Sequence, residues 1–389
     1  MFPVHKHSYL QCVTKIDPRI INRTVDLARD NYTIDQFDTL PPFNRLCSEQ
    51  PNIPVCSCDV TRRPVGFGRW GMKKLRRELH STNRWTVMQA IHSIGDLVYD
   101  PERNFEAIRL RVPARFSDLV IDEDPAVRER VCMVLATISN LLDGKYSILK
   151  NHRMINNLAR ILNDEEPAVR MKVIVLIEKL SKVWMCADIL VNNGFVEMII
   201  ERLDQYIEDD PCTPYYLRTM QWLMYCTGKY IAIERGFHKT LTTILYNDTN
   251  CEVLAEALKC MAMLISTPRG KCFAIEGNLL IKLYNLLHDQ RREIYSAAAG
   301  CMVFATIKTE AILKAIELPN LIERLLILAR SHHDLTTQIH CIQVITNLCG
   351  HGKVRKYVLE TYSDKIRSIY TQHDEQAERF KHNLLTLQF

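Results

Sequence analysis

The clearest pattern of apolar and polar positions in the chain is a helical one that occurs twice. The stretch "EDPAVRERVCMVLATISNL" at Glu123–Leu141 aligns position by position with "EEPAVRMKVIVLIEKLSKV" at Glu165–Val183. In both copies apolar residues recur at i, i+4, i+7, i+8, i+11 and i+14, which places them on one face of an α-helix. Pro125 and Pro167 stand where the first helical turn tolerates proline. The pattern therefore predicts two long helices that begin at these prolines.

Weaker copies extend this series along the chain, and a turn signal separates two shorter apolar segments between successive long helices. Long helices are expected at 85–98, 123–141, 165–183, 215–226, 252–266, 293–307 and 335–348. Turns are expected at 193–194, 235–236, 276–277 and 317–319. Three helices in about 42 residues is typical of armadillo and HEAT repeats, whose single units bury their apolar faces only by stacking. We predict an all-α protein, an armadillo/HEAT-type right-handed α-solenoid of about seven repeats over residues 66–370.

The two ends of the chain differ from this repetitive part. Residues 1–65 hold seven of the fifteen prolines and show no sustained periodicity. Proline fixes φ and removes a backbone donor, so we expect an extended N-terminal arm, with at most a short helix near Arg19–Asp30. This arm would lie along a partner or along the body of the protein. Residues 371–389 are expected to form a C-terminal tail or cap.

A glycine-lysine pair recurs at residues 144, 228, 270 and 352 and suggests a phosphate-binding loop. Such a loop needs G-x-x-x-x-G-K followed by Ser or Thr. Here Tyr, Tyr, Cys and Val follow the lysines, and no glycine stands five positions before any pair. We expect instead that each glycine caps the end of a long helix in the left-handed conformation, with the lysine offsetting the helix dipole.

Composition indicates a folded protein, since 47% of residues are hydrophobic and 24% are charged. No apolar run has the roughly 18 residues that a membrane span needs, and the first residues do not resemble a signal peptide, so a cytosolic protein is expected. Four of the fourteen cysteines, Cys132, Cys260, Cys301 and Cys341, fall within apolar helical patterns, which favours buried free thiols. The cluster of Cys47, Cys56 and Cys58 lacks the second pair of ligands that a zinc site needs.

Candidate chemistry is sparse. The chain has no H-E-x-x-H, no His followed by Glu and no G-x-S-x-G, so neither a metal-dependent hydroxylase nor a serine hydrolase is indicated. In His332-His333-Asp334, the densest histidine cluster, Asp334 is expected to be a helix N-cap rather than a metal ligand. We expect no enzyme activity, no cofactor, no metal and no small-molecule substrate.

The net charge of +5 is concentrated in one segment, because residues 62–77 alone carry +7. Lysines and arginines interleave there with aromatic residues, and Lys73, Arg76 and Arg77 would share a face of a helix. This segment is interpreted as a solvated face, as a site for an acidic protein surface such as a tubulin tail, or as a nucleic-acid site. The last is disfavoured because no basic stripe continues along the repeats. The candidate partner-binding residues are Arg69, Trp70, Lys73, Lys74, Arg76, Arg77, Asn140 and Asn347.

Several stretches resemble the radial spoke head 14 homologue family of armadillo-type proteins. They are "GMKKLRREL", "VMQAIHSIGDLVYDP" at Val87–Pro101, the pair "LVIDEDPAVR" and "ILNDEEPAVR", and "AAGCMVFATIKTE" at Ala298–Glu310. The resemblance implies a non-enzymatic structural component of the radial spokes in the axoneme of motile cilia and sperm flagella, within the cytoskeleton of the cytoplasm. Its partners would be other radial spoke proteins, with the axonemal doublet microtubule as a further candidate, and neither nucleic acid nor membrane is expected. The arm and an insertion near Glu208–Pro214 depart from the family.

The alternative interpretation is a peptide-binding adaptor of the importin or catenin type, located in the cytoplasm or nucleus. Asn140 and Asn347 stand near the ends of long helices, where armadillo proteins often place an asparagine that binds the backbone of an extended peptide. The other repeats have Lys182, Thr227 or Lys308 thereabouts, so the asparagine series is incomplete. The long third helices are expected to line the groove in either case.

Overall fold

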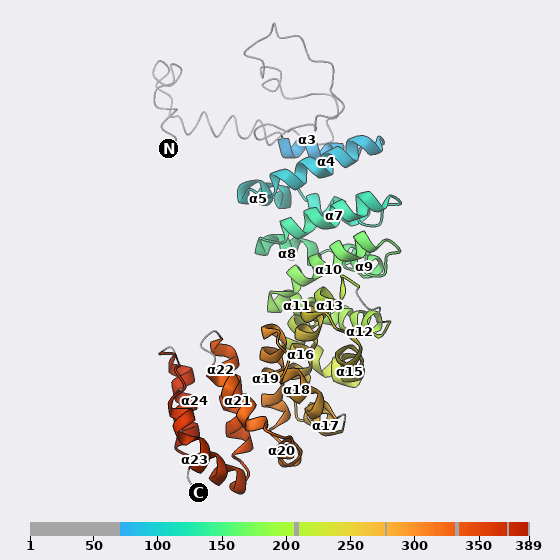
Figure 1. Ribbon diagram of the computed structural model, residues 1–389. Coiled ribbons are helices and arrows are strands. Elements are labelled where there is room, and N and C mark those ends of the chain that lie inside the picture. The colour runs from blue at the N-terminus through green and yellow to red at the C-terminus, as the bar shows by residue number, and fades with distance from the viewer. Residues whose placement is uncertain (1–70, 206–209, 277, 331–333, 372, 388–389) are drawn as a thin grey trace, which may run out of the picture. The chain divides into compact units, whose positions relative to one another are not determined.

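The computed structural model describes residues 71–205, 210–276, 278–330, 334–371 and 373–387 (Figure 1). Within these ranges every regular element is an α-helix, and the 22 helices are numbered α3 to α24. The prediction of an all-α protein is therefore confirmed for the described part of the chain. The N-terminal arm, Cys47, Cys56, Cys58, Arg69, Trp70, Gly277, His332 and His333 lie outside the described residues.

The chain divides into two compact units, residues 1–112 and residues 113–389. The described helices of the first unit are α3 (Gly71–Glu78), α4 (Arg84–Leu97) and α5 (Pro101–Arg109). Met72, Leu75 and Leu79 are buried, and α3 packs against both α4 and α5. Asn83 and Asp100 cap the starts of α4 and α5, and the side chain of each accepts one backbone N–H group that the first helical turn leaves unpaired.

Six long helices form a continuous stack in the second unit. They are α7 (Pro125–Ile138), α10 (Pro167–Ser181), α13 (Thr213–Tyr225), α16 (Cys251–Ile265), α19 (Arg292–Ala305) and α22 (Leu335–Leu348). Each packs against the next, and α22 packs against the terminal helix α24 (Glu375–Leu385). The expected free thiols Cys132, Cys260, Cys301 and Cys341 are buried in this stack. The long helices begin within two residues of the positions that the apolar pattern predicts.

Shorter helices connect the long ones, and those from α8 onward pack against them. They are α6 (Val112–Leu119), α8 (Leu142–Leu149), α9 (His152–Ile161), α11 (Trp184–Asn192), α12 (Phe195–Asp204), α14 (Gly228–Glu234), α15 (Phe237–Asn247), α17 (Gly270–Glu276), α18 (Leu279–Leu287), α20 (Thr309–Ile316) and α21 (Leu321–Ala329). After α22 a single helix of 16 residues, α23 (Gly352–Arg367), stands in place of two short ones.

The turn between the two short helices has a regular backbone signature. Gly194 and Gly236, with φ of 80° and 76°, precede α12 and α15 in the left-handed conformation. Asn278 and Asn320 occupy the same position before α18 and α21, with φ of 52° and 54°. Asparagine is one of the few residues with a Cβ that adopts this conformation readily. The four positions are evenly spaced along the chain, so the turn repeats with the period of the apolar pattern.

The prediction of left-handed glycine caps at the ends of the long helices is wrong. Gly144 lies in the first turn of α8, and Gly228, Gly270 and Gly352 are the first residues of α14, α17 and α23. None of the four has a positive φ. At Gly144, Gly228 and Gly270 the short helix starts directly against the last carbonyl groups of the preceding long helix, where a Cβ would clash with backbone oxygen. Glycine is needed at these three positions because the two helices approach each other too closely for a Cβ, and not because the backbone has a positive φ.

Candidate functional site

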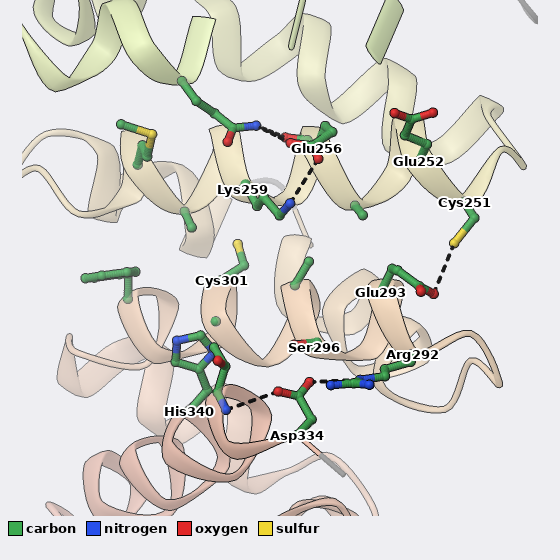
Figure 2. A pocket seen from close by; sticks show the side chains of 18 of the residues that line it. Cys251, Glu252, Glu256, Lys259, Arg292, Glu293, Ser296, Cys301, Asp334 and His340 are labelled. Atoms are coloured by element: carbon green, nitrogen blue, oxygen red, sulfur yellow. Dashed lines mark hydrogen bonds and ion pairs between the residues drawn. The ribbon is translucent and has the colours of Figure 1, made fainter. Parts of the chain in front are cut away.

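A groove of about 780 Å³ crosses four successive long helices, α13, α16, α19 and α22 (Figure 2). Its lining contains several residues with small side chains, which leave room between the larger ones. These residues are Ala255, Ala262, Ser296, Ala297 and Gly300. Tyr225, Met263 and Phe304 add apolar surface from the later turns of their helices. The groove therefore combines an apolar surface with the charged side chains described next.

His340 of α22 contacts α19 at Gly300. A Cβ on Gly300 would lie 3.0 Å from the His340 Cε1 atom, so the imidazole occupies the space beside a glycine in the middle of a helix. Burial lowers the pKa of His340, and nearby Asp334 only partly opposes this effect. Within the described structure the buried Nδ1 atom has no hydrogen-bond partner. At neutral pH this wall of the groove thus presents an uncharged imidazole.

Ion pairs join the long helices across the groove and its margin. Glu256 of α16 accepts hydrogen bonds from Gln221 Nε2 (2.6 Å) and Lys259 Nζ (2.9 Å). Glu252 pairs with Arg218 of α13, whose Nε lies 3.7 Å from Glu178 Oε2 of α10. Burial lowers the pKa of Arg218, but the bond to Glu252 and the other carboxylates outweigh it and raise that pKa. These carboxylates are already paired within the protein.

Two further carboxylates lie near the N-termini of α19 and α22. Asp334 Oδ2 is 3.5 Å from Arg292 Nε, and Asp334 Oδ1 accepts the backbone N–H of Thr336 (3.1 Å). Asp334 is thus the N-cap that the sequence predicts. Burial acts to raise its pKa, but hydrogen bonds from Thr337, Ser296 and Arg292 outweigh it and hold the pKa below its usual range. Glu293 contacts the Cys251 thiol, with Sγ 3.8 Å from Oε2, and Figure 2 shows this pair beside Glu252 at one end of the groove.

The thiols of the groove are not activated. Burial raises the pKa of Cys301 to about 12, and burial together with Glu293 raises the pKa of Cys251. A cysteine nucleophile requires a lowered pKa, because the thiolate is the reactive form. Cys251 and Cys301 therefore lack the lowered pKa that a cysteine nucleophile requires. Across the described residues no group of three or more His, Cys, Asp and Glu side chains is placed to hold a metal ion.

The predicted basic site belongs to the first unit, whereas the groove belongs to the second. Lys73, Lys74, Arg76 and Arg77 are on α3 and are half-buried. Lys74 Nζ lies 3.6 Å from Glu78 Oε1 of the same helix. Arg69 and Trp70, the first two residues of this candidate site, precede the described range. Its role in binding an acidic surface stays a prediction.

The two candidate asparagines have different surroundings. Asn347 of α22 is half-buried, and its amide donates to Val303 O (2.8 Å) and Thr306 Oγ1 (3.1 Å) of the preceding long helix. Asn140, just after α7, is exposed and accepts a hydrogen bond from Lys179 Nζ (3.3 Å). Neither residue lines the groove. A shared role in binding a peptide backbone stays a prediction.

The residues that line the groove are not among those predicted from the sequence. They include Gln221, Glu252, Glu256, Ser296, Gly300 and His340. The sequence does contain a signal that could identify groove positions. When α16 is aligned with α19 so that Cys260 matches Cys301, Lys259 occupies the same alignment position as Gly300. Both positions line the groove, Lys259 on α16 and Gly300 on α19.

Both the helix stack and the comparison with solved structures are consistent with an α-solenoid. The crystal structure of an engineered protein is similar to this chain with a TM-score of 0.71 and 17% sequence identity, covering 80% of this chain and 77% of the other. A second engineered protein matches with a TM-score of 0.39 and 17% identity over 72% of this chain and 96% of the other, too low for any inference. Because the sequence identity is 17%, the similarity to the first engineered protein bears on the fold alone. No family model matches the chain.

None of the helices in the described ranges is long and apolar enough to cross a membrane.

Proposed function

We propose that the helices form seven right-handed armadillo-type repeats, each with two short helices followed by a long one, as in α8, α9 and α10. The left-handed residue at 194, 236, 278 and 320 supports this interpretation, because it marks the same turn at even intervals along the chain. The stacking of each long helix on the next supports it as well. After the seventh long helix, α22, the single helix α23 stands in place of a short pair and α24 closes the stack.

We further propose that the protein is a non-enzymatic scaffold that binds a segment of another protein in the groove over α13, α16, α19 and α22. One observation carries this proposal: four long helices present a groove whose carboxylates are largely paired and whose thiols have raised pKa values. Such a surface offers shape, apolar contact and fixed charges to a partner. It offers no activated nucleophile.

The assembly that we propose for this scaffold is the radial spoke of motile cilia and sperm flagella. This step depends on the resemblance of "DLVYDP", the paired "PAVR" stretches and "AAGCMVFATIKTE" to the radial spoke family. Two of these stretches have evident structural roles. The arginines of "PAVR" bind the loops before their helices, and Gly300 of "AAGC" admits His340. The partners would be neighbouring spoke proteins and the doublet microtubule.

Cross-linking mass spectrometry on isolated axonemes tests the proposal. We expect cross-links from lysines beside the groove, such as Lys259, to radial spoke proteins. Substitution Ala297→Arg places a large cation in the groove and should abolish these cross-links. The matched control Leu313→Arg changes an exposed residue of α20 that does not line the groove, and should preserve them. A tagged protein found in nuclei or cell junctions of cells without cilia would contradict the axonemal assignment.

The groove also suits the alternative function, a peptide-binding adaptor of the importin or catenin type. Its wall contains both charged residues and the apolar side chains of Tyr225 and Phe304, as an extended peptide with mixed side chains would require. Against it, the Asn347 amide is engaged by Val303 and Thr306. Location distinguishes the two, because an adaptor would be present in nuclei or at junctions irrespective of cilia.

A further inference from the structure

A second surface of the second unit combines exposed aromatic side chains with lysines. We name it the lysine–aromatic patch and define it by Lys179, Lys182, Trp184, Met185, Trp222 and Tyr225. These residues come from the C-terminal halves of α10 and α13, from Lys182 directly after α10, and from the start of α11. Trp184 is 71% exposed, Tyr225 72% and Met185 40%. Large apolar side chains grouped on a surface indicate an interaction site, whereas scattered ones do not.

Contacts between its elements show that the aromatic residues and Met185 of the patch come from neighbouring helices. Helices α8, α11 and α13 pack side by side, with α11 against both of the others. The Tyr146 hydroxyl of α8 lies 3.4 Å from Met185 Sδ, and the Cys226 thiol lies 3.5 Å from the Trp184 carbonyl oxygen. The rings of Trp222 and Tyr225 have centroids 5.9 Å apart. Tyr225 also lines the groove, so the patch adjoins it.

The lysines of this region lie close enough to affect one another. Buried Lys145 donates to the Lys179 carbonyl oxygen, and Lys179 Nζ donates to Ala136 O (3.1 Å) and to Asn140. Burial lowers the pKa of both Lys145 and Lys179, and repulsion from Lys182 lowers both further. Lys182 Nζ lies 3.1 Å from Glu178 Oε1, a carboxylate that also neighbours Arg218.

The charges around the patch do not balance. At the lysine end of the patch, Lys145, Lys179 and Lys182 stand against Glu178, which also neighbours Arg218, so this end keeps an excess of positive charge. A negatively charged ligand would relieve the mutual repulsion of the lysines. The exposed aromatic rings would in turn bury apolar surface against that ligand. Burial of this kind is why tryptophan and tyrosine contribute much of the binding free energy at protein interfaces.

We propose that the lysine–aromatic patch binds an acidic, extended segment of a partner protein that also carries a large apolar side chain. Carboxylates of this segment would lie near Lys179 and Lys182, and its apolar side chain would pack against Trp184 and Tyr225. A protein segment fits better than nucleic acid, because Glu178 pairs with Lys182 within the basic surface and no row of arginines tracks a phosphate backbone among the residues of the patch. This inference goes beyond the groove and does not depend on the axonemal assignment.

The test uses the full chain and a fluorescein-labelled synthetic peptide composed of Glu and Asp with one central Phe, followed by fluorescence anisotropy. We expect saturable binding that weakens at least about tenfold on Trp184→Ala, since an exposed aromatic anchor would be lost. Lys182→Ala should weaken binding about threefold and reduce its dependence on salt, since one screened charge pair is removed. A peptide with Phe replaced by Ala, and another with its acids replaced by Ser, should each bind more weakly.

Trp85→Ala is the matched control, because Trp85 is similarly exposed at 61% but lies on α4 of the first unit. It should leave the affinity unchanged, and circular dichroism of all variants should report unaltered helical content. The proposal is overturned if the acidic peptide does not bind, or if Trp184→Ala and Trp85→Ala have equal effects. It is also overturned if a single-stranded RNA oligonucleotide or phosphatidylserine vesicles bind this patch in preference to the acidic peptide.

Discussion

The long helices of the second unit begin and end by different physical means. At their starts, Asp124, Asn250 and Asp334 accept backbone N–H groups that lie two or three residues further along the chain. At their ends, the next short helix approaches the last carbonyl groups closely at Gly144 and Gly270. The starts of α7, α16 and α22 therefore depend on local hydrogen bonds, whereas the ends of α7 and α16 depend on how two helices pack. Substitutions at the ends should cost more.

Gly144→Ala should have the largest effect. The new Cβ would overlap the backbone oxygen of Ile138, which cannot move away without shifting α7 or α8. Forcing extra volume into a packed backbone contact costs about 3 kcal/mol, so the free energy of unfolding should fall by about that amount. Urea unfolding followed by circular dichroism measures it.

Gly352→Ala is the control within the same glycine-lysine series. Gly352 opens α23, and a Cβ there would have no heavy atom within 4 Å. Because alanine restricts the unfolded chain more than glycine does, this variant should be neutral or up to about 1 kcal/mol more stable. Equal losses from the two substitutions would show that close approach at Gly144 is not what requires glycine.

The same contrast explains which parts of the fold can be predicted from the sequence. Pro125, Pro167 and Asp334 mark helix starts through interactions with their immediate neighbours, so local patterns reveal them. The role of Gly144 depends on Ile138 in another helix, and a glycine after a helix suggests a left-handed cap instead. In two repeats the left-handed residue is an asparagine, Asn278 or Asn320, which directly follows the residues that the sequence marks as the turn.

The candidate site is less predictable than the fold for a related reason. The repeat alignment follows apolar residues such as Cys260 and Leu264, which are fully buried. Groove residues such as Glu256 and His340 belong to different long helices and are brought together only when the helices stack. Lys145 and Lys179 are far apart in the sequence and meet at the end of α10, so the lysine–aromatic patch has no local signature at all.

Arg128 lies in the first turn of α7 and binds both the loop before that helix and Asp164, which precedes α10. Its contribution to stability therefore combines a local contact with a contact between helices. Its guanidinium binds Asp164 through two hydrogen bonds of 2.7 and 2.8 Å, and the two side chains are 15% and 7% exposed. Removing one partner leaves a largely buried charge unpaired, so Arg128→Ala should lower the free energy of unfolding by about 2 kcal/mol. Chemical denaturation measures the loss.

Arg170→Ala is the matched control for Arg128→Ala. Arg128 Nη1 donates to Asp122 O (2.8 Å) and Glu123 O (3.1 Å), and Arg170 Nη1 donates to Asp164 O (2.8 Å) and Glu165 O (2.9 Å) in the same manner. The two variants lose equivalent loop contacts, and only Arg128→Ala also loses the hydrogen-bonded ion pair with Asp164. If both cost the same, the ion pair contributes nothing.

The Arg128–Asp164 pair should also make stability depend on pH. Burial acts to raise the pKa of Asp164, but the bonds from Arg128 and the Glu166 backbone outweigh it and lower that pKa in the folded protein. A carboxyl group with a lowered folded-state pKa stabilises the protein above its unfolded-state pKa of about 4, and this contribution is lost as the pH falls further. The stability difference between the native protein and Arg128→Ala should be constant near neutral pH and shrink below about pH 5. A difference that stayed constant down to about pH 3 would contradict the assignment.

The smallest expected effect separates two helix starts that are nearly identical in sequence. Asp124 Oδ1 accepts the Ala126 N–H at 2.9 Å, whereas Glu166, the corresponding residue before α10, makes no such bond from its side chain. The longer glutamate chain does not suit the N-cap geometry that aspartate satisfies. Asp124→Ala should therefore cost about 1 kcal/mol and Glu166→Ala close to nothing, while Glu166→Asp should stabilise the protein by up to about 1 kcal/mol. Thermal unfolding ranks the three variants by stability. If Glu166→Ala destabilised the protein as much as Asp124→Ala does, the side-chain hydrogen bond of Asp124 would not be what stabilises the start of α7.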